Sequence, residues 1–181
     1  MILSIDPGIN FCGLSVLDIS SNFTVVDSVL VKNTRRFTDE EKLVEAEYGN
    51  RVVKIQAIIR TVLELLAKYN FDTIVIEAPF YNALTPVAFG SLLEVIGAIR
   101  YLIVIPNHLR FKLIEPLLAK KLFTSKSLAS KELIKQFLIS KKEDGSITIS
   151  IDIETLSEHE IDSIAIGFSY NLMLKDQASH I

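Results

Sequence analysis

Ile2-Leu3-Ser4-Ile5-Asp6-Pro7-Gly8 is the stretch that decides the fold. It predicts a short strand that is almost wholly apolar, as strands buried on both faces of a sheet are, and this strand delivers a carboxylate into a Pro-Gly turn. Residues 11–19 and 23–31 predict two further strands, and the turn residues Ser20-Ser21-Asn22 separate them. The chain therefore opens with three strands in succession.

A second carboxylate follows a second apolar strand. Thr73-Ile74-Val75-Ile76 leads directly into Glu77, and a predicted helix over 38–68, interrupted near Gly49, connects it to the opening strands. A helical crossover makes the two strands parallel, and parallel strands deliver their carboxyl ends to one edge of a sheet. Either acid alone is also typical of an ordinary strand-end turn. Together, Asp6 and Glu77 indicate a site at that edge.

The third group of polar side chains opens the last predicted helix, over about 158–175. Ser157 and Glu160 form a capping box, which gives Glu160 a structural role. His159 and Asp162 lie three residues apart, and this spacing places them on one face of the helix.

These groups form a set of metal ligands. The carboxylates of Asp6, Glu77 and Asp162, with the imidazole of His159, can hold Mg²⁺ or Mn²⁺, and Glu158 is an alternative ligand. With a phosphodiester as a further ligand, the set is typical of a two-metal nuclease.

Composition favours one globular α/β domain over residues 1–181. The chain is 49% hydrophobic and holds seven glycines and a single cysteine, Cys12, which we interpret as a buried structural thiol. One cysteine cannot form an internal disulfide, which suits a reducing cytoplasm. No apolar run reaches the ~18 residues of a membrane span and no secretory signal is apparent, so we expect a soluble protein.

Positive charge is concentrated in one part of the chain. The formal net charge is −3, but residues 100–142 hold ten Lys or Arg against two acids, which leaves +8 there and −11 elsewhere. A local field, not the net charge, steers a polyanion to a protein. The same region predicts a helix over 86–104, a fifth strand over 111–115, a short helix, and a helix over about 130–142.

Four segments in order, ILSIDPG, IVIEAPF, KKLFTSKSLASK and HEIDSIAIG, resemble the RuvC-type Holliday-junction resolvases of the RNase H-like nuclease superfamily. The resemblance covers nearly the whole chain. It implies an α/β, RNase H-like fold with a mixed five-stranded central sheet and helices on both faces. Where many relatives carry an aspartate, this chain has His159, so its role as ligand, proton relay or both stays open.

The resemblance also implies DNA-binding residues in two loops. Phe80, three positions after Glu77, matches an aromatic residue that stacks on bases at the crossover, and Tyr81 lies beside it; a loop aromatic packed into the core is the alternative. Lys120 and Lys131 match two family lysines at the same separation, with Lys131 at the scissile phosphate. Lys121 and Lys126 are expected to contact the DNA backbone. Relatives have a glycine-rich stretch where this chain reads Leu-Phe-Thr-Ser-Lys-Ser-Leu-Ala-Ser.

The implied activity is that of a metal-dependent endonuclease. The enzyme would use two Mg²⁺ ions, or Mn²⁺ in their place. As a homodimer it would nick opposite strands of a four-way DNA junction. The expected location is a prokaryotic or viral-host cytoplasm, and an organelle stays open as an alternative. The runner-up is an RNase H-like nuclease that acts on flaps, forks or RNA-containing substrates. An ATP-binding protein of the actin and Hsp70-like class would need a second glycine-rich loop, and no Gly-Gly occurs. A non-catalytic junction-binding module would not be expected to keep all three acids.

Overall fold

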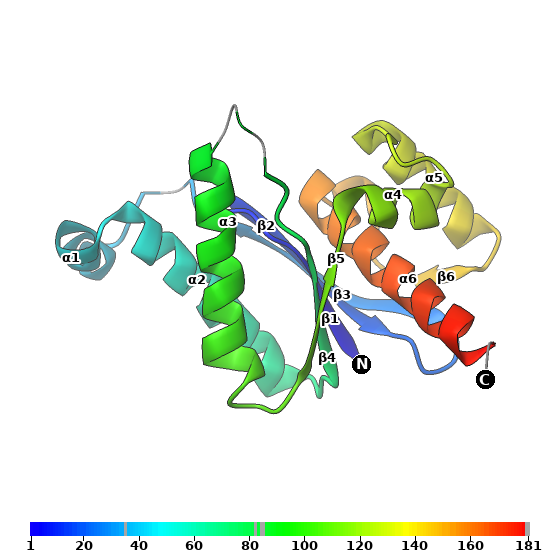
Figure 1. The fold of residues 1–181 in the computed structure, drawn as a ribbon, viewed down its shortest axis with the longest axis horizontal. Coiled ribbons are helices and arrows are strands. Elements are labelled where there is room, and N and C mark those ends of the chain that lie inside the picture. The colour runs from blue at the N-terminus through cyan, green and yellow to red at the C-terminus, as the bar shows by residue number, and fades with distance from the viewer. Residues whose placement is uncertain (35, 82, 84–85, 180–181) are drawn as a thin grey trace.

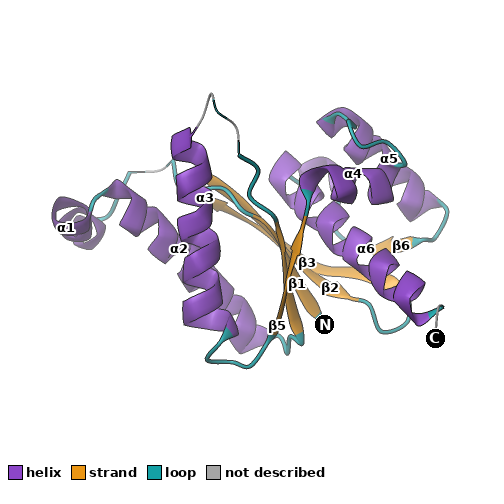
Figure 2. Cartoon of the chain, in the orientation of Figure 1, coloured by secondary structure: helices purple, strands orange, loops and turns teal. Residues whose placement is uncertain are grey.

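A six-stranded mixed sheet with helices on both faces forms the protein (Figure 1). The computed structural model describes residues 1–34, 36–81, 83 and 86–179. The strands are β1 (Ile2–Asp6), β2 (Phe11–Asp18), β3 (Phe23–Lys32), β4 (Thr73–Glu77), β5 (Arg110–Ile114) and β6 (Ile147–Ile149). The α-helices are α1 (Asp39–Tyr48), α2 (Asn50–Lys68), α3 (Pro86–Ile99), α4 (Pro116–Thr124), α5 (Lys131–Glu143) and α6 (Glu158–Ala178). Figure 2 shows the strands as one layer between two groups of helices.

The strand order is β5-β4-β1-β2-β3-β6. The first three strands pair antiparallel, as their turn residues predict, and β1 pairs parallel with β4, so that Ile5 lies opposite Ile76. The predicted parallel pairing of the two strands that end in a carboxylate is therefore confirmed.

The prediction of five strands is wrong, because β6 adds a sixth. β6 pairs parallel with the first residues of β3, so that Phe23 lies opposite Ile147. In this three-residue strand only Ile147 and Ile149 are buried. Two apolar residues are too few for an alternating pattern to predict a strand. The turn predicted at Asp144-Gly145 is present, with Gly145 at a φ of +78°.

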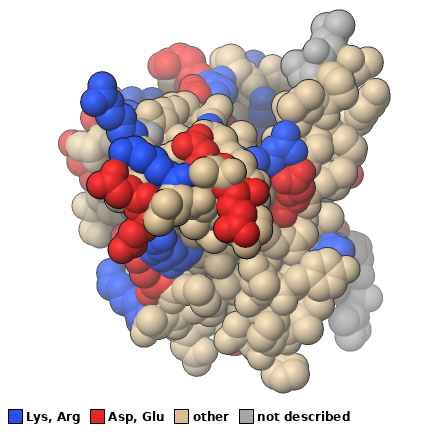
Figure 3. Space-filling view, turned by 90° about the vertical axis from the view of Figure 1, so that its left-hand side faces the viewer, with Lys and Arg blue, Asp and Glu red and all other residues tan. Residues whose placement is uncertain are grey.

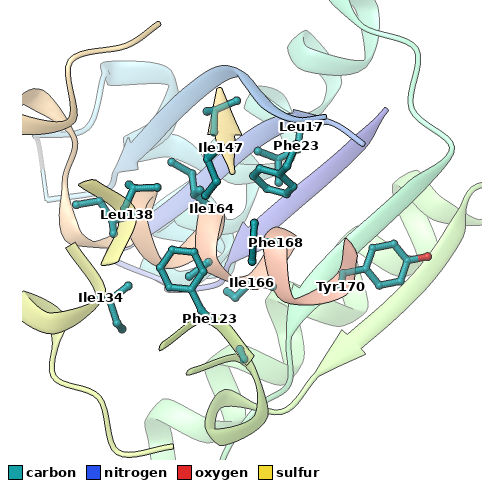
Figure 4. Close-up of a cluster of buried hydrophobic side chains, with 14 of the residues drawn as sticks. Leu17, Phe23, Phe123, Ile134, Leu138, Ile147, Ile164, Ile166, Phe168 and Tyr170 are labelled. Atoms are coloured by element: carbon teal, nitrogen blue, oxygen red, sulfur yellow. The ribbon is translucent and has the colours of Figure 1, made fainter. Parts of the chain in front are cut away.

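Alternation along the strands assigns side chains to the two faces. In β1, Leu3 and Ile5 join a core with α2 and α3, whereas Ile2 packs on the opposite side against α6. Figure 4 shows the second core, in which Phe123 of α4 and Phe168 of α6 meet edge to face. The two helical layers thus rest on opposite faces of the strands that end in Asp6 and Glu77.

The helix predicted over 38–68 is interrupted where expected. Thr38 and Glu41 form the predicted capping box of α1, and Gly49 ends that helix at a φ of +87°. Positive φ values favour glycine, so the sequence fixes this break between α1 and α2.

Helix α3 continues as a short π-helix, η1 (Arg100–Val104). Together, Pro86–Val104 is long and apolar enough to cross a membrane by length and composition, with a mean hydropathy of 1.8. The prediction that no apolar run reaches this length is therefore wrong for this helix. One face of the helix, with Val95, Ile99 and Ile103, packs into the protein's own core, and 33% of the apolar stretch is buried there.

Candidate active site

The alternation along β1 and β4 aims both strand-end carboxylates at α6. Ser4 Oγ donates a 2.7 Å hydrogen bond to the carbonyl oxygen of Ser163 in α6, which places Ser4, and with it Asp6 two residues on, on the α6 face. Val75 packs on the same side, so Glu77 faces that way as well. The sheet therefore brings Asp6 and Glu77 together at one edge, as their positions in the sequence predict.

The start of α6 is fixed against the sheet by its own cap and by close backbone contact. Both halves of the predicted capping box are present: Ser157 Oγ accepts from the Glu160 N–H, and the Glu160 carboxylate accepts from the Ser157 N–H. Gly13 of β2 lies directly beneath this turn, because a Cβ there would come 2.0 Å from the carbonyl oxygen of His159. Sequence analysis did not identify Gly13 as a residue that positions the site.

Buried serines set the register of α6. Ser4 bonds Ser163, as described, and Ser15 also meets the Ser163 hydroxyl at 2.5 Å. All three side chains are fully buried. Because buried polar groups are held by their hydrogen-bond partners, these contacts restrict how α6 can slide or rotate. A serine within an otherwise apolar strand was the feature of the sequence that could have predicted these contacts with α6.

His159 is paired with Asp6. Its Nδ1–H donates to Asp6 Oδ2 at 2.7 Å, and its ring stacks on Phe11, with the ring centroids 5.6 Å apart. The hydrogen bond to Asp6 raises the pKa of His159 above 6.5, outweighing partial burial. A nearby carboxylate favours the imidazolium, whereas burial disfavours it. With Nδ1 engaged, Nε2 is the ring nitrogen left for chemistry.

The other two carboxylates are destabilised as anions. Burial, with the charges of Asp6 and Asp162, raises the pKa of Glu77 from 4.5 to about 8. Burial, with the charge of Asp6, raises the pKa of Asp162 from 3.8 to about 6. Lys120 and His159 oppose both shifts. A cluster of acids that repel one another in a partly buried site is a common feature of functional sites.

The donor set suits a hard divalent cation, although the ligands are not arranged around a single point. Among the residues that the structure describes, no three His, Cys, Asp or Glu side chains form a group that could hold a metal ion as they stand. Asp6 is engaged by His159, and burial, together with repulsion from neighbouring carboxylates, keeps the anions of Glu77 and Asp162 unfavourable. A cation would offset exactly this accumulated negative charge, so the residue types fit Mg²⁺ or Mn²⁺.

The predicted lysines divide into two groups. Lys120 is close enough to act on Glu77 and Asp162, and Lys131 Nζ forms an ion pair with Glu158 Oε1 at 2.6 Å. Lys121 and Lys126 are exposed and do not touch the carboxylates. The structure thus places Lys120 and Lys131 at the cluster, and it leaves Lys121 and Lys126 exposed.

The predicted aromatic residues lie in the loop after Glu77. The side chains of Phe80 and Tyr81 are 65% and 59% exposed, so the alternative of aromatics packed into the core is wrong. Tyr81 meets Phe89 of α3 edge to face, whereas Phe80 is open to solvent. Cys12 is fully buried and its pKa is raised to about 12, which makes it a structural thiol and not a nucleophile.

Comparison with known proteins identifies the arrangement. The crossover junction endodeoxyribonuclease RuvC of Campylobacter lari is 26% identical over 174 residues, which cover 96% of this chain and 98% of that protein. The structure of Thermus thermophilus RuvC in complex with Holliday junction substrate superposes with a TM-score of 0.70 at 17% identity, over 97% of this chain and 95% of that one. This chain is similar to the RuvC-type resolvases in sequence and fold. The RuvC-type fold also matches the yeast mitochondrial Holliday junction resolvase Ydc2, with a TM-score of 0.63 at 16% identity over 97% and 82% of the two chains.

No family model matches the chain. The similarity to RuvC-type proteins therefore rests on the sequence match and the superpositions, and these confirm the resemblance inferred from the four segments. They also confirm the expected RNase H-like class of fold, with the strand number corrected to six.

Proposed function

We propose that this RuvC-type chain is a metal-dependent endonuclease that resolves four-way DNA junctions. The observation that carries the proposal is the convergence of Asp6, Glu77 and Asp162 at one edge of the RuvC-type sheet, with pKa values of two of them raised by burial and mutual charge. The basic stretch over 100–142 supports a polyanionic substrate. We place the reaction in the cytoplasm, in keeping with a single, buried cysteine.

Each residue has a proposed part in the reaction. The carboxylates of Asp6, Glu77 and Asp162 would hold two Mg²⁺ or Mn²⁺ ions, which when bound supply Lewis acidity to the phosphodiester. His159 is held by Asp6 through Nδ1, so we propose that it acts through Nε2, as a ligand, by accepting a proton, or both. Lys131 would stabilise negative charge on the scissile phosphate.

DNA recognition is proposed to use the surface around the carboxylates. Exposed Phe80, with Tyr81 beside it, would stack on unpaired bases at the branch point, and Lys120 would add positive charge at the site. Lys121 and Lys126 would bind backbone phosphates. Stacking accepts any base, so this surface would recognise the shape of a branch more than its sequence.

A comparison of substrates tests the proposal. The protein is incubated with a four-way junction, a fork, a flap and an RNA–DNA hybrid, each with Mg²⁺ or with chelator. We expect paired nicks in the four-way junction that need the metal. Preferred cutting of flaps, forks or the hybrid would favour the alternative RNase H-like activity.

Asp6→Asn supplies the site-specific arm of this test. It should abolish cleavage and keep junction affinity within about tenfold, because Asp6 is proposed to bind metal and not DNA. Asp18→Asn is the matched control, because Asp18 ends β2 and caps Ser20 in a turn where asparagine serves equally well. Cleavage by Asp6→Asn at the wild-type rate would exclude the proposed site.

Paired nicking needs two active sites, and an apolar face offers the means to pair them. We propose that two copies associate through α2 and η1, where a groove of about 610 Å³ is lined by the polar side chains Gln56 and Arg60 and by five apolar residues, which are Val52, Ile55, Ile59, Leu63 and Leu102. Leu63 and Leu102 are about half exposed. The lowest part of the side of the molecule drawn in Figure 3 shows no charged side chains. Two-fold symmetry would bring the same patch of each copy together.

The dimer is tested by sedimentation. The Leu63→Glu variant should be a monomer. The control is Leu128→Glu, because Leu128 is an exposed leucine in the loop before α5, and this variant should remain a dimer. A dimer unaffected by Leu63→Glu would place the interface elsewhere.

A further inference from the structure

Glu158 connects the proposed phosphate-binding lysine to the catalytic cluster. We propose that Glu158 is a positioning residue, which holds the ammonium group of Lys131 at the mouth of the cluster where the scissile phosphate would enter. This inference rests on the proposed nuclease function and gives Glu158, named above only as an alternative metal ligand, a part in it.

The ion pair joins the first residues of two helices. Lys131 is the first residue of α5 and Glu158 the first residue of α6, and Ser130 and Ser157 cap the two helices through hydrogen bonds to the backbone. The backbone of each partner is therefore fixed, and the 2.6 Å contact between Lys131 Nζ and Glu158 Oε1 fixes the longer side chain.

The same carboxylate oxygen faces the catalytic histidine. Glu158 Oε1 lies 3.7 Å from His159 Nε2, the ring nitrogen not engaged by Asp6. Lys131, Glu158 and Asp162 also line one cavity of about 190 Å³ beside the cluster. Glu158 therefore holds Lys131 next to both residues that α6 contributes to the site.

The pair suits positioning better than stabilisation. Both side chains are 53% exposed, and ion pairs that are so exposed contribute little to the stability of the fold. Lysine is a flexible four-carbon chain, so a fixed partner reduces the freedom lost when it meets a phosphate. An ammonium group has three N–H donors, so one can remain on Glu158 while the others reach the phosphate.

Without Glu158, another acid would compete for the lysine. Glu132 lines the same cavity and is the next residue along α5. Pairing with Glu132 would draw Lys131 toward α5 and away from Asp162. The charge of Glu158 repels DNA only weakly by comparison, since it is offset by the lysine it holds.

Single-turnover cleavage and junction binding, measured separately, test the proposal. Glu158→Gln should cut about tenfold more slowly, with affinity unchanged within about threefold, because position and not binding is lost. Glu158→Asp keeps the charge and should recover part of the rate. The matched control is Glu94→Gln, because Glu94 pairs with Arg51 at the same 2.6 Å, both side chains are also nearly half exposed, and neither lines this cavity. That variant should cut at the wild-type rate.

A double-mutant cycle isolates the link to Lys131. In a Lys131→Ala background, Glu158→Gln should change the rate by less than about twofold, because there is no ammonium group left to position. Equal tenfold losses in both backgrounds would overturn the proposal, and so would faster cutting by Glu158→Gln. If wild type cuts no junction at all, the nuclease function itself has failed, which is a distinct result.

Discussion

Glu77→Gln should stabilise the metal-free protein, and should do so only at neutral and alkaline pH. The folded protein raises the pKa of Glu77 from 4.5 to about 8, so between these values the folded state binds a proton that the unfolded state releases. By linkage, the stability of wild type then falls as pH rises through this window. Glutamine keeps the shape of the protonated acid and never ionises.

The magnitude follows from the size of the pKa change. A rise from 4.5 to about 8 corresponds to a penalty of at most about 5 kcal/mol once Glu77 is fully ionised. The carboxylates lower this penalty if they move apart, so we expect a gain of about 2–5 kcal/mol for the variant at pH 9. At pH 5 the two proteins should differ by less than about 1 kcal/mol, because Glu77 is then protonated.

Urea unfolding from pH 5 to pH 9 with chelator present measures the effect. The wild-type curve should fall below that of the variant progressively from pH 5 to 8. Mg²⁺ should then stabilise wild type at pH 9 more than it stabilises the variant, because only wild type offers the third carboxylate. A stability difference that stays constant across the pH range would refute the assigned charge repulsion at Glu77.

Three further outcomes are expected. Because Asp6 raises the pKa of His159, pH–rate profiles should show that cleavage by wild type increases with pH through a value above 6.5. His159→Asp should keep Mg²⁺-dependent cleavage but lose this rise with pH. His159→Ala should lose most activity. Gly13→Ala should lower the free energy of unfolding by about 2 kcal/mol in urea and should slow cleavage, because its Cβ meets the backbone of His159. Gly97→Ala is the control, because a Cβ there meets nothing within 4 Å, and it should neither destabilise the protein nor slow cleavage. Lys126→Ala should weaken junction binding and reduce by about one the slope of log affinity against log salt concentration. Lys142→Ala is the control and should leave this slope unchanged. Equal slopes for wild type and both variants would mean that the DNA surface lies elsewhere.

The strands and caps that carry the site were predictable because their signals are local. Apolar runs ending in an acid predicted β1 and β4, and the Ser157–Glu160 capping box fixed where α6 begins. The break between α1 and α2 was likewise predictable from one residue, Gly49, because glycine readily adopts a positive φ. Each of these signals depends only on a few consecutive side chains.

The contacts between distant segments could not be predicted in the same way. The pairing of His159 with Asp6 joins residues 153 positions apart, and it depends on how α6 rests on Gly13. The ligand types were recognisable, but their hydrogen bonds were not. β6 was missed because three residues carry too little periodicity, and its pairing depends on a free edge of β3.

Helix α6 supplies the proposed catalytic side chains His159 and Asp162 near its start, and every residue from Ser163 to Asn171 further along it is buried. Peptide groups in such an element exchange their hydrogens with water only when the whole molecule opens. The middle of α6 should therefore show protection close to the global free energy of unfolding, whereas α1, which lies at the periphery and exposes Leu43, should exchange early. Heat inactivation should then coincide with loss of the fold. Because the proposed site is built on the start of this buried helix, changes that loosen the helix to alter the rate should also lower the melting temperature of the protein.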